Sequence, residues 1–298
     1  SFQGVSIGRK VEEDVAYGWR TSVYKHGHPI APSLISVSAA SFELLDDSIG
    51  LLSGDTIPFP NYVYSSMPES ERVKRLATQE IMTLFEKYFG PYPFADEHYG
   101  HVQFTRGGGM EHQTLSSMGG FNYGLIAHEL AHQWFGDHIT CATWKDLWLN
   151  EGFATWAAAF AYEKSMGVDT AKLFWDAYAK NILHLEEGSG AVYQEDTADV
   201  SVLFSPRMVY QKGAWVLRML RHKLGDEDFF EGLFQYAQSP RLQNGFAQTK
   251  DFQFFMEQAY GKSLDDFFRR WVFLEGGPKY TLDWIQHEDR LHLILYQF

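Results

Sequence analysis

The sequence predicts an α+β fold with a mostly helical centre and β-rich ends. Alternating polar and apolar residues, as in residues 34–38, recur within the first 65 residues. From Ser66 the apolar residues follow a helical period, which continues with few interruptions to about Leu274. Gly276-Gly277-Pro278 ends that pattern, and residues 280–298 alternate again.

Turn and breaker residues divide the first region into short strands. Asp46-Asp47 and Ser53-Gly54-Asp55 are typical of turns, and Pro58 and Pro60 are expected to close the region. These signals predict short strands and place the end of the β-rich part near residue 65.

The central region begins with a helix start signal. In Ser66-Met67-Pro68-Glu69 the serine is a candidate capping residue and the proline suits the first helical turn. We expect a helix from this point to Gly90-Pro91. Residues 99–105 then predict a strand that runs into the glycine-rich loop 106–112, after which the pattern is helical.

Composition limits the class of protein. A chain of 298 residues with 45% apolar residues can bury a sizeable core in one large domain or about two. The longest uncharged apolar stretch, 153–162, is far shorter than the roughly 20 residues of a transmembrane helix. A formal charge of −13 argues against a nucleic-acid partner, which would require a basic surface.

The ends and the single cysteine say little about the compartment. Ser1 to Gly4 contain neither an initiator Met nor a targeting segment, so we expect the chain to begin inside a longer protein. Cys141 has no partner for an internal disulfide and is expected to be a small buried residue. A cytoplasmic and a periplasmic or secreted location are both compatible with this pattern.

Two histidines with helical spacing predict a metal site. Residues i and i+4 share a helix face, so His128 and His132 direct two imidazoles to one point. Catalytic zinc takes three protein ligands, and Glu151, 19 residues after the second histidine, is the candidate third ligand. Glu129 lies beside the pair, where it could take a proton from the attacking water.

The same spacing also occurs in ordinary amphipathic helices, so the flanking residues decide between the two interpretations. His128 and His132 lie on a different face from an apolar stripe, and a helix with both faces committed is expected to be buried. A buried imidazole pair is costly unless it is hydrogen-bonded or ligated, which favours a metal. The stripe consists of Tyr123, Ile126, Ala127, Leu130 and Trp134.

Four motifs in order resemble the gluzincin aminopeptidases related to aminopeptidase N, a family that includes the leukotriene epoxide hydrolase. They are Gly-Gly-Met-Glu at 108–111, the segment 127–137 with its paired histidines, residues 146–154, and Tyr-Gln-Lys-Gly at 210–213. The resemblance implies a thermolysin-like catalytic domain with a small mixed sheet over residues 66–275. Residues 1–65 would end a β-rich N-terminal domain, and 276–298 would begin a following β-domain.

The resemblance also implies the chemistry of a zinc aminopeptidase. One zinc ion per chain would be held by His128, His132 and Glu151, with Glu129 as general base. Tyr210 would donate to the oxyanion of the tetrahedral intermediate. By pattern alone Tyr210 also fits a core position, although Gly213, a helical glycine, suggests a close approach that leaves room beside its ring.

The substrates implied are peptides with a free N-terminus. Glu111 would bind the α-amine, and the backbone of Gly107, Gly108, Gly109 and Met110 would line the substrate as an edge strand. The family usually carries Asn where this chain has His112, an exchange that could alter substrate preference or pH dependence.

Other interpretations use the same residues. Thr155 or Asp146 could orient a metal ligand from the side. A thermolysin-like endopeptidase would share the metal ligands but would need an open cleft, and Glu111 argues against it by closing the amine end. A non-catalytic scaffold relative would be expected to lose the ligands, and here none is lost.

Overall fold

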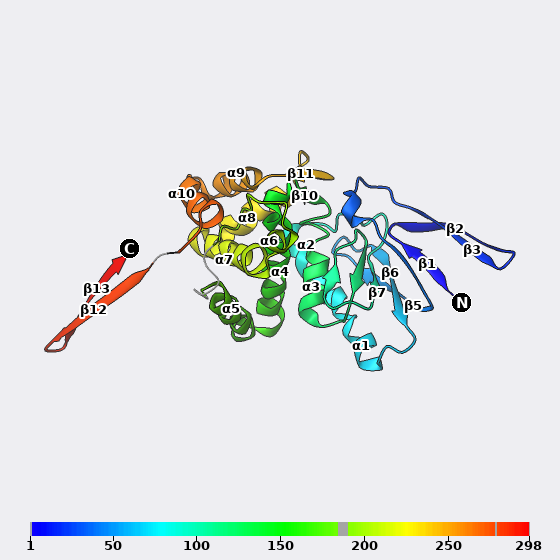
Figure 1. The fold of residues 1–298 in the computed structure, drawn as a ribbon, viewed down its shortest axis with the longest axis horizontal. Helices are drawn as coiled ribbons and strands as arrows, with labels where there is room; N and C mark the ends of the chain where they lie inside the picture. Colours follow the sequence, from blue (N-terminus) through cyan, green and yellow to red (C-terminus); the bar gives the residue numbers. More distant parts are fainter. Residues whose placement is uncertain (1, 184–189, 278, 298) are drawn as a thin grey trace.

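The structure, a computed structural model, describes residues 2–183, 190–277 and 279–297. Helices make up its centre, and a β-hairpin projects from each end of an elongated molecule (Figure 1). The α+β class expected from the sequence is confirmed. The expectations that involve Ser1, Pro278 and Phe298 lie outside the described residues.

The N-terminal strands form two small antiparallel pairs. β1 pairs with β4, and β2 pairs with β3 through a register shift between Lys10 and Glu12. A short 3₁₀ helix, η1, begins at Pro32 and leads into β4. The bounds are β1 Gln3–Ser6, β2 Arg9–Ala16, β3 Trp19–Lys25, η1 Pro32–Leu34 and β4 Val37–Ala40.

A five-stranded mixed sheet follows, in the order β5-β6-β7-β9-β8. β6 is parallel to β7 and β7 to β9, whereas the β5–β6 and β8–β9 pairs are antiparallel. Because β6 pairs with β7, this sheet crosses the boundary expected at residue 65. The bounds are β5 Phe42–Gly50, β6 Thr56–Tyr64, β7 Gly100–Gln103, β8 Gly109–Met110 and β9 Leu115–Met118.

Of the two turns predicted in this region, one is absent and one is present. Asp46-Asp47 lies inside β5, where it pairs with Phe59 and Pro60 of β6, and Pro58 and Pro60 lie within β6. Cross-strand pairing of the long hairpin outweighs the local preference of these residues. The chain does turn at Ser53-Gly54-Asp55, where Leu51 N–H donates to the carbonyl of Asp55 at 2.9 Å.

The helix expected from Ser66 is broken into two, α1 Glu69–Lys74 and α2 Ala77–Phe89. Pro68 is the N-cap of α1, and no side chain caps this end. At the break, the Arg75 carbonyl accepts from both the hydroxyl and the backbone N–H of Thr78, at 2.7 and 3.1 Å. The guanidinium of Arg75 is itself held by an ion pair with Asp47 of β5.

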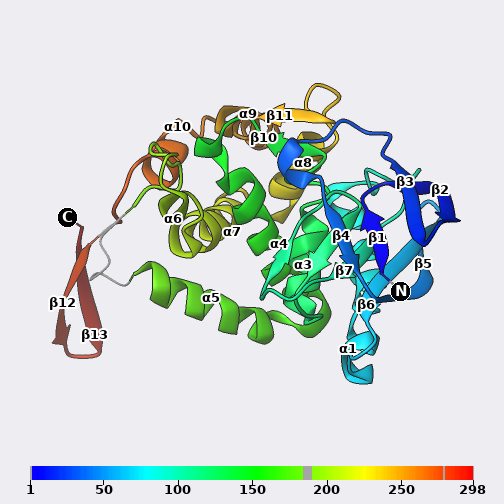
Figure 2. The same cartoon turned by 45° about the vertical axis from the view of Figure 1, so that its right-hand side comes forward.

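The remaining helices surround α4, whose residues from Trp148 to Ala161 are all buried. In the rotated view α3 lies between the mixed sheet and α4 (Figure 2). β10 and β11 form a parallel pair in a region expected to be helical. The bounds are α3 Tyr123–Ala131, β10 Ile139–Cys141, η2 Trp144–Asp146, α4 Trp148–Met166, α5 Val168–Ile182, α6 Val200–Leu203, η4 Pro206–Lys212, α7 Gly213–Leu224, α8 Asp226–Ala237, β11 Gly245–Ala247, α9 Thr249–Tyr260, α10 Asp265–Phe268 and η5 Arg269–Phe273.

The alternating C-terminal residues form one antiparallel hairpin of β12 (Tyr280–His287) and β13 (Arg290–Gln297). Every residue of both strands is exposed, so the alternation predicted the strands correctly but not a buried face. Across the described parts of the chain, no helix combines the length and apolarity needed to cross a membrane.

Candidate metal centre and active site

α3 presents the two histidines from a helix with a defined start. The Asn122 side chain caps it by accepting from Leu125 N–H at 3.0 Å. His128 lies within the helix, and His132 is its C-cap residue with helical dihedral angles, so the i,i+4 relation holds to the last turn. Ile126 and Leu130 on the opposite face are fully buried and hold α3 against the core.

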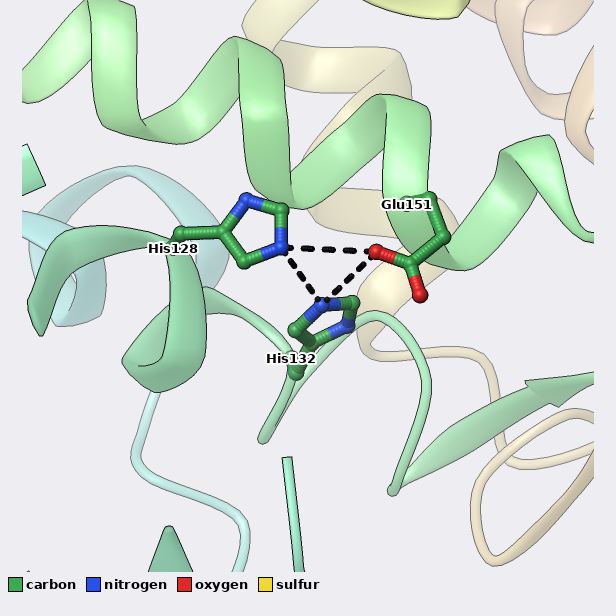
Figure 3. A group of neighbouring side chains, drawn as sticks. All are labelled: His128, His132 and Glu151. Atoms are coloured by element: carbon green, nitrogen blue, oxygen red, sulfur yellow. Dashed lines mark hydrogen bonds and ion pairs between the residues drawn. The ribbon is translucent and has the colours of Figure 1, made fainter. Parts of the chain in front are cut away.

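The two imidazoles and Glu151 meet in one triangle (Figure 3). The Nε2 atoms of His128 and His132 lie 3.1 Å apart, and Glu151 Oε2 lies 3.3 Å from each of them. Four ligands at 2.0–2.1 Å from a tetrahedral zinc ion are separated by roughly 3.3 Å. The three sides of this triangle therefore fit a zinc ion without rearrangement.

A hydrogen bond selects which nitrogen of His132 faces the triangle. Its Nδ1 lies 3.1 Å from the carbonyl oxygen of Phe135, so Nδ1 donates and Nε2 keeps its lone pair for a metal. The chain makes this bond by turning sharply at Gly136, whose φ is +140°. A Cβ atom at Gly136 would lie 2.9 Å from His132 Nδ1, which explains the glycine.

Glu151 is placed by the first turns of α4. Trp148 Nε1 donates to Thr249 Oγ1 at 2.9 Å, and Asp146 Oδ1 accepts from both the backbone and the hydroxyl of Thr249. Asp146 is therefore committed to anchoring α4 and contacts no candidate ligand. The expectation that Asp146 orients a ligand is not supported by these bonds, whereas Thr155 does line the cavity described below.

The close approach expected at Gly213 is present, but its partner differs from the one expected. A Cβ atom on Gly213 would lie 3.1 Å from the Cα of Gly152, the residue after Glu151. α4 and α7 thus touch backbone to backbone at this pair. The glycine brings Glu151 and the segment that ends at Lys212 together, rather than leaving room beside the Tyr210 ring.

Carboxylates gather around the buried ring of His132. Burial disfavours charge on His132, yet the carboxylates of Glu111 and Glu151 raise its pKa well above the usual range. Burial also raises the pKa of Glu129, and the charges of Glu111 and Glu151 add to that effect. For Glu151, burial is outweighed by the two imidazoles, which hold its pKa below the usual range.

None of the described residues that line the adjoining cavity is a Lys or Arg, and burial lowers the pKa of His128. A bound divalent ion would supply positive charge to this group of donors. A second triplet, Glu111, Glu129 and His132, also has ligand atoms within 4.8 Å of one another. Only the triplet with both histidines, however, contains two imidazole nitrogens, the type of donor that zinc prefers.

The loop before α3 brings Glu111 to the same place. β8 is the edge strand of the mixed sheet, with Gly109 paired to Met118 and Met110 to Ser117 of β9. The edge position expected for residues 107–110 is thus observed for Gly109 and Met110. Gly108 is held by Gly119 N–H at 2.8 Å from its carbonyl, whereas Gly107 is exposed and does not line the cavity.

Tyr210 lies on η4, a π-helical segment whose start is capped by Ser205 Oγ, 3.3 Å from Met208 N. Its ring is parallel to that of His128, with centroids 6.2 Å apart. Burial first and the nearby Glu151 second raise the pKa of the phenol, so the hydroxyl keeps its proton and can donate it in a hydrogen bond. π-helical turns are frequent at functional sites.

Apart from the fully buried His132, these groups line one cavity of about 1050 Å³. Its walls include Glu111, His128, Glu129, Glu151 and Tyr210 together with Gly108 to Met110. Sequence reasoning missed a second wall from the N-terminal region, formed by Ala31, Pro32, Ser33 and Leu34. The proline-rich composition of this stretch indicates a turn but not its neighbours.

His112 and Cys141 also lie beside the site. His112 Nδ1 is 2.9 Å from Ser117 Oγ, and burial lowers its pKa to about 4, so the ring is neutral and makes a structural bond. Cys141 lines the cavity, donates its backbone N–H to Asn150 Oδ1 at 3.1 Å, and is 8% exposed. Burial raises the pKa of its thiol to about 12.

Comparison with known proteins identifies the family. The model of the peptidase family M1 domain matches residues 121–271, about half of the chain. The chain belongs to peptidase family M1. The matched residues include the two histidines of α3, Glu151 and Tyr210.

Several curated relatives of this M1 chain are named aminopeptidases. Aminopeptidase M1-B of Oryza sativa subsp. japonica is 29% identical over 97% of the chain, and aminopeptidase N of Lactococcus lactis subsp. lactis is 36% identical over 58%. These matches cover 34% and 21% of the relatives, so the chain spans about a third or less of their length.

Solved M1 structures share the fold. An M1 zinc metallopeptidase from Deinococcus radiodurans matches 91% of the chain and 61% of its own at a TM-score of 0.78 and 25% identity. Aminopeptidase A of Legionella pneumophila matches 99% of this chain and 36% of its own, with a TM-score of 0.81 and 21% identity. The second likeness concerns the fold alone.

Proposed function

We propose that this chain is the catalytic part of a zinc aminopeptidase that hydrolyses the N-terminal peptide bond of peptides. The observation that carries the proposal is one cavity that joins a zinc-type triplet to the carboxylate of Glu111. The triplet supplies the hydrolytic centre. Glu111 supplies a charge that a free α-ammonium group would satisfy.

We assign one zinc ion per chain to His128, His132 and Glu151. When bound, such an ion polarises the substrate carbonyl and lowers the pKa of a water molecule. The matching distances within the triplet and the selected tautomer of His132 support this assignment.

Two further residues would carry out the proton transfer and the charge stabilisation. Glu129 would take the proton from the attacking water and deliver it to the leaving amine, a role suited to a buried carboxylate with a raised pKa. Tyr210 would donate its hydroxyl hydrogen bond to the carbonyl oxygen as negative charge develops there. One such donor is commonly worth about 3 kcal/mol.

The substrate would lie along the edge strand. Gly108, Gly109 and Met110, which line the cavity, would offer backbone groups to the peptide beside the edge strand β8, and Gly107 lies outside the cavity wall. Glu111 would hold the α-ammonium group at the end of that strand and so set cleavage after the first residue.

The predicted domain division is kept with one change. Residues 276–298 would begin a β-domain, and the first β-rich pairs would end another. Because β5 and β6 belong to the mixed sheet, we infer that the thermolysin-like catalytic domain begins near Phe42 rather than at residue 66.

The test compares free and N-acetylated versions of one peptide. Acetylation removes the charge that Glu111 would pair with, a loss of about 2–5 kcal/mol, or about 30-fold to several thousand-fold in kcat/KM. Glu111→Ala should erase most of the difference, and Glu12→Gln, which removes an exposed charge from β2, should preserve it. Equal cleavage of both peptides, or internal cuts in a long peptide, would indicate an endopeptidase instead.

A further inference from the structure

The loop that carries Glu111 is held by contacts outside the cavity. Glu111 follows the two-residue strand β8, and β9 begins four residues later at Leu115. Its position therefore depends on what fastens the residues between, His112, Gln113 and Thr114.

Gln113 is the first fastening. Gln113 is fully buried, and its side-chain amide nitrogen lies 2.7 Å from Nε2 of His26 and 3.4 Å from the carbonyl oxygen of Pro29. Both partners belong to the N-terminal segment, 87 and 84 residues earlier in the chain. A buried amide that reaches across the fold is costly to leave without partners, so these contacts hold the loop against that segment.

Thr114 is the second fastening. Its φ is +65°, a conformation that a β-branched residue keeps only where its surroundings impose it. Its N–H donates to Gln133 Oε1 at 2.8 Å, and Gln133 Nε2 donates to Asp137 Oδ2 at 2.7 Å in the turn after His132. The hydroxyl of Thr114 accepts from Gly8 N–H at 3.2 Å. The loop is thus hydrogen-bonded to the turn that follows α3 on one side and to the N-terminal strands on the other.

His26 is itself fixed. Its Nδ1 lies 2.8 Å from Glu97 Oε2, and the second oxygen of Glu97 accepts from Gly27 N–H at 2.6 Å. Hydrogen bonds from His26 and Gly27 outweigh partial burial and lower the pKa of Glu97, which therefore stays ionised. The same N-terminal segment continues to Leu34 and forms the second wall of the cavity.

We propose that Gln113 and His26 are positioning residues for substrate binding, which fasten the Glu111 loop to the N-terminal segment and so fix where the substrate ammonium group lies relative to the scissile bond. The inference rests on the proposed function, because it takes Glu111 as the site for that group. The N-terminal segment would then help to determine which peptide bond is cleaved.

A purely structural role makes a different prediction. If the contact only stabilised the fold, its loss would lower the melting temperature and change the hydrolysis of all substrates alike. If it positions Glu111, its loss selectively weakens substrates that carry a free amine, because only they use that carboxylate.

The experiment removes the contact from each side, with Gln113→Ala and His26→Ala in the intact protein. We expect KM for a free-amine peptide to rise about tenfold or more, with kcat within about threefold and zinc content unchanged. The preference for free over N-acetylated peptide should fall by the same factor. His28→Ala is the matched control, because His28 pairs with Asp96 at 2.8 Å beside His26 but does not contact Gln113.

A double variant tests the route of the effect. In a Glu111→Ala background, Gln113→Ala should produce no further loss of the free-amine preference, since coupled residues are not additive. Unchanged preference in folded Gln113→Ala and His26→Ala, or full additivity with Glu111→Ala, would overturn the inference. If Gln113→Ala does not fold, His26→Ala decides alone.

The two proposals fail separately. The proposed function is judged on the unsubstituted protein, by its zinc content and its preference for the free amine. The positioning role is judged only on how the Gln113 and His26 variants change that preference.

Discussion

The metal end and the amine end of the cavity are built in different ways. His128, His132 and Glu151 come from two helices, and α4 is buried along most of its length. Glu111 comes from a loop held by side-chain hydrogen bonds to residues far away in the sequence. Helix spacing brings the two histidines together, and the packing of α3 and α4 brings Glu151 to them. The Glu111 loop depends on side-chain hydrogen bonds instead, so variants at the two ends should fail in different ways.

The largest expected effect is loss of the metal. Glu151→Ala removes the only carboxylate of the candidate triplet and should lower zinc content from about one ion per chain to near zero, with activity lost as well. Zinc analysis after dialysis is the measurement. Glu195→Ala, on an exposed carboxylate that pairs with Lys145, is the control. Stoichiometric zinc in Glu151→Ala would remove this residue from the metal end.

Glu129→Gln should separate the metal from catalysis. The amide keeps the size of the side chain but cannot take a proton, so the rate should fall by about 10²- to 10⁴-fold while zinc remains bound. Zinc content and turnover are measured on the same preparation. Loss of zinc would instead place Glu129 among the ligands, in the second triplet with Glu111 and His132.

Tyr210→Phe should affect the transition state alone. The ring and its packing over His128 are kept, while the donor hydroxyl is deleted. We expect kcat to fall on the order of 10²-fold with little change in KM. Steady-state kinetics with one free-amine peptide decide this. Unchanged kcat would make Tyr210 a core residue, the alternative that its sequence pattern left open.

The smallest expected effect concerns the helix contact behind the metal end. Gly213→Val places a branched side chain against the Gly152 backbone and should cost about 1–3 kcal/mol of stability through overpacking. Thermal unfolding measures it, with activity reduced less than tenfold. Gly4→Val is the control, because a Cβ atom there would meet nothing within 4 Å. Equal melting temperatures for the two variants would contradict the close contact.

What the sequence predicts follows the same contrast. The spacing of His128 and His132 was sufficient to predict that their side chains meet, because residues four apart lie on the same face of a helix. The triangle that they form with Glu151 is present. The start and break of the first helix were not predictable, because no periodic pattern indicates the contacts at the break. There the Thr78 hydroxyl bonds the Arg75 carbonyl, while Asp47 of a distant strand pairs with the Arg75 guanidinium.

The amine end was only partly predictable. The glycine-rich loop and its edge position were expected, but no period or motif connects Gln113 with His26, which are 87 residues apart. The role of Pro58 and Pro60 in β6 was not predictable for a related reason, since they were expected to close the region and instead lie inside the strand. Its two prolines are tolerated because pairing with β5 and β7 supplies the stability that local preference denies.

The reactivity of the buried thiol beside the cavity can be used to measure local opening of the protein. Cys141 is the single cysteine, and with a pKa of about 12 its reactive thiolate is on the order of 10⁻⁵ of the population at neutral pH. A thiol-specific reagent should therefore label Cys141 much faster in molecules in which β10 has opened than in the closed form. The labelling rate measures the free energy of that opening, and its slowing on addition of zinc measures how strongly the ion holds this region closed.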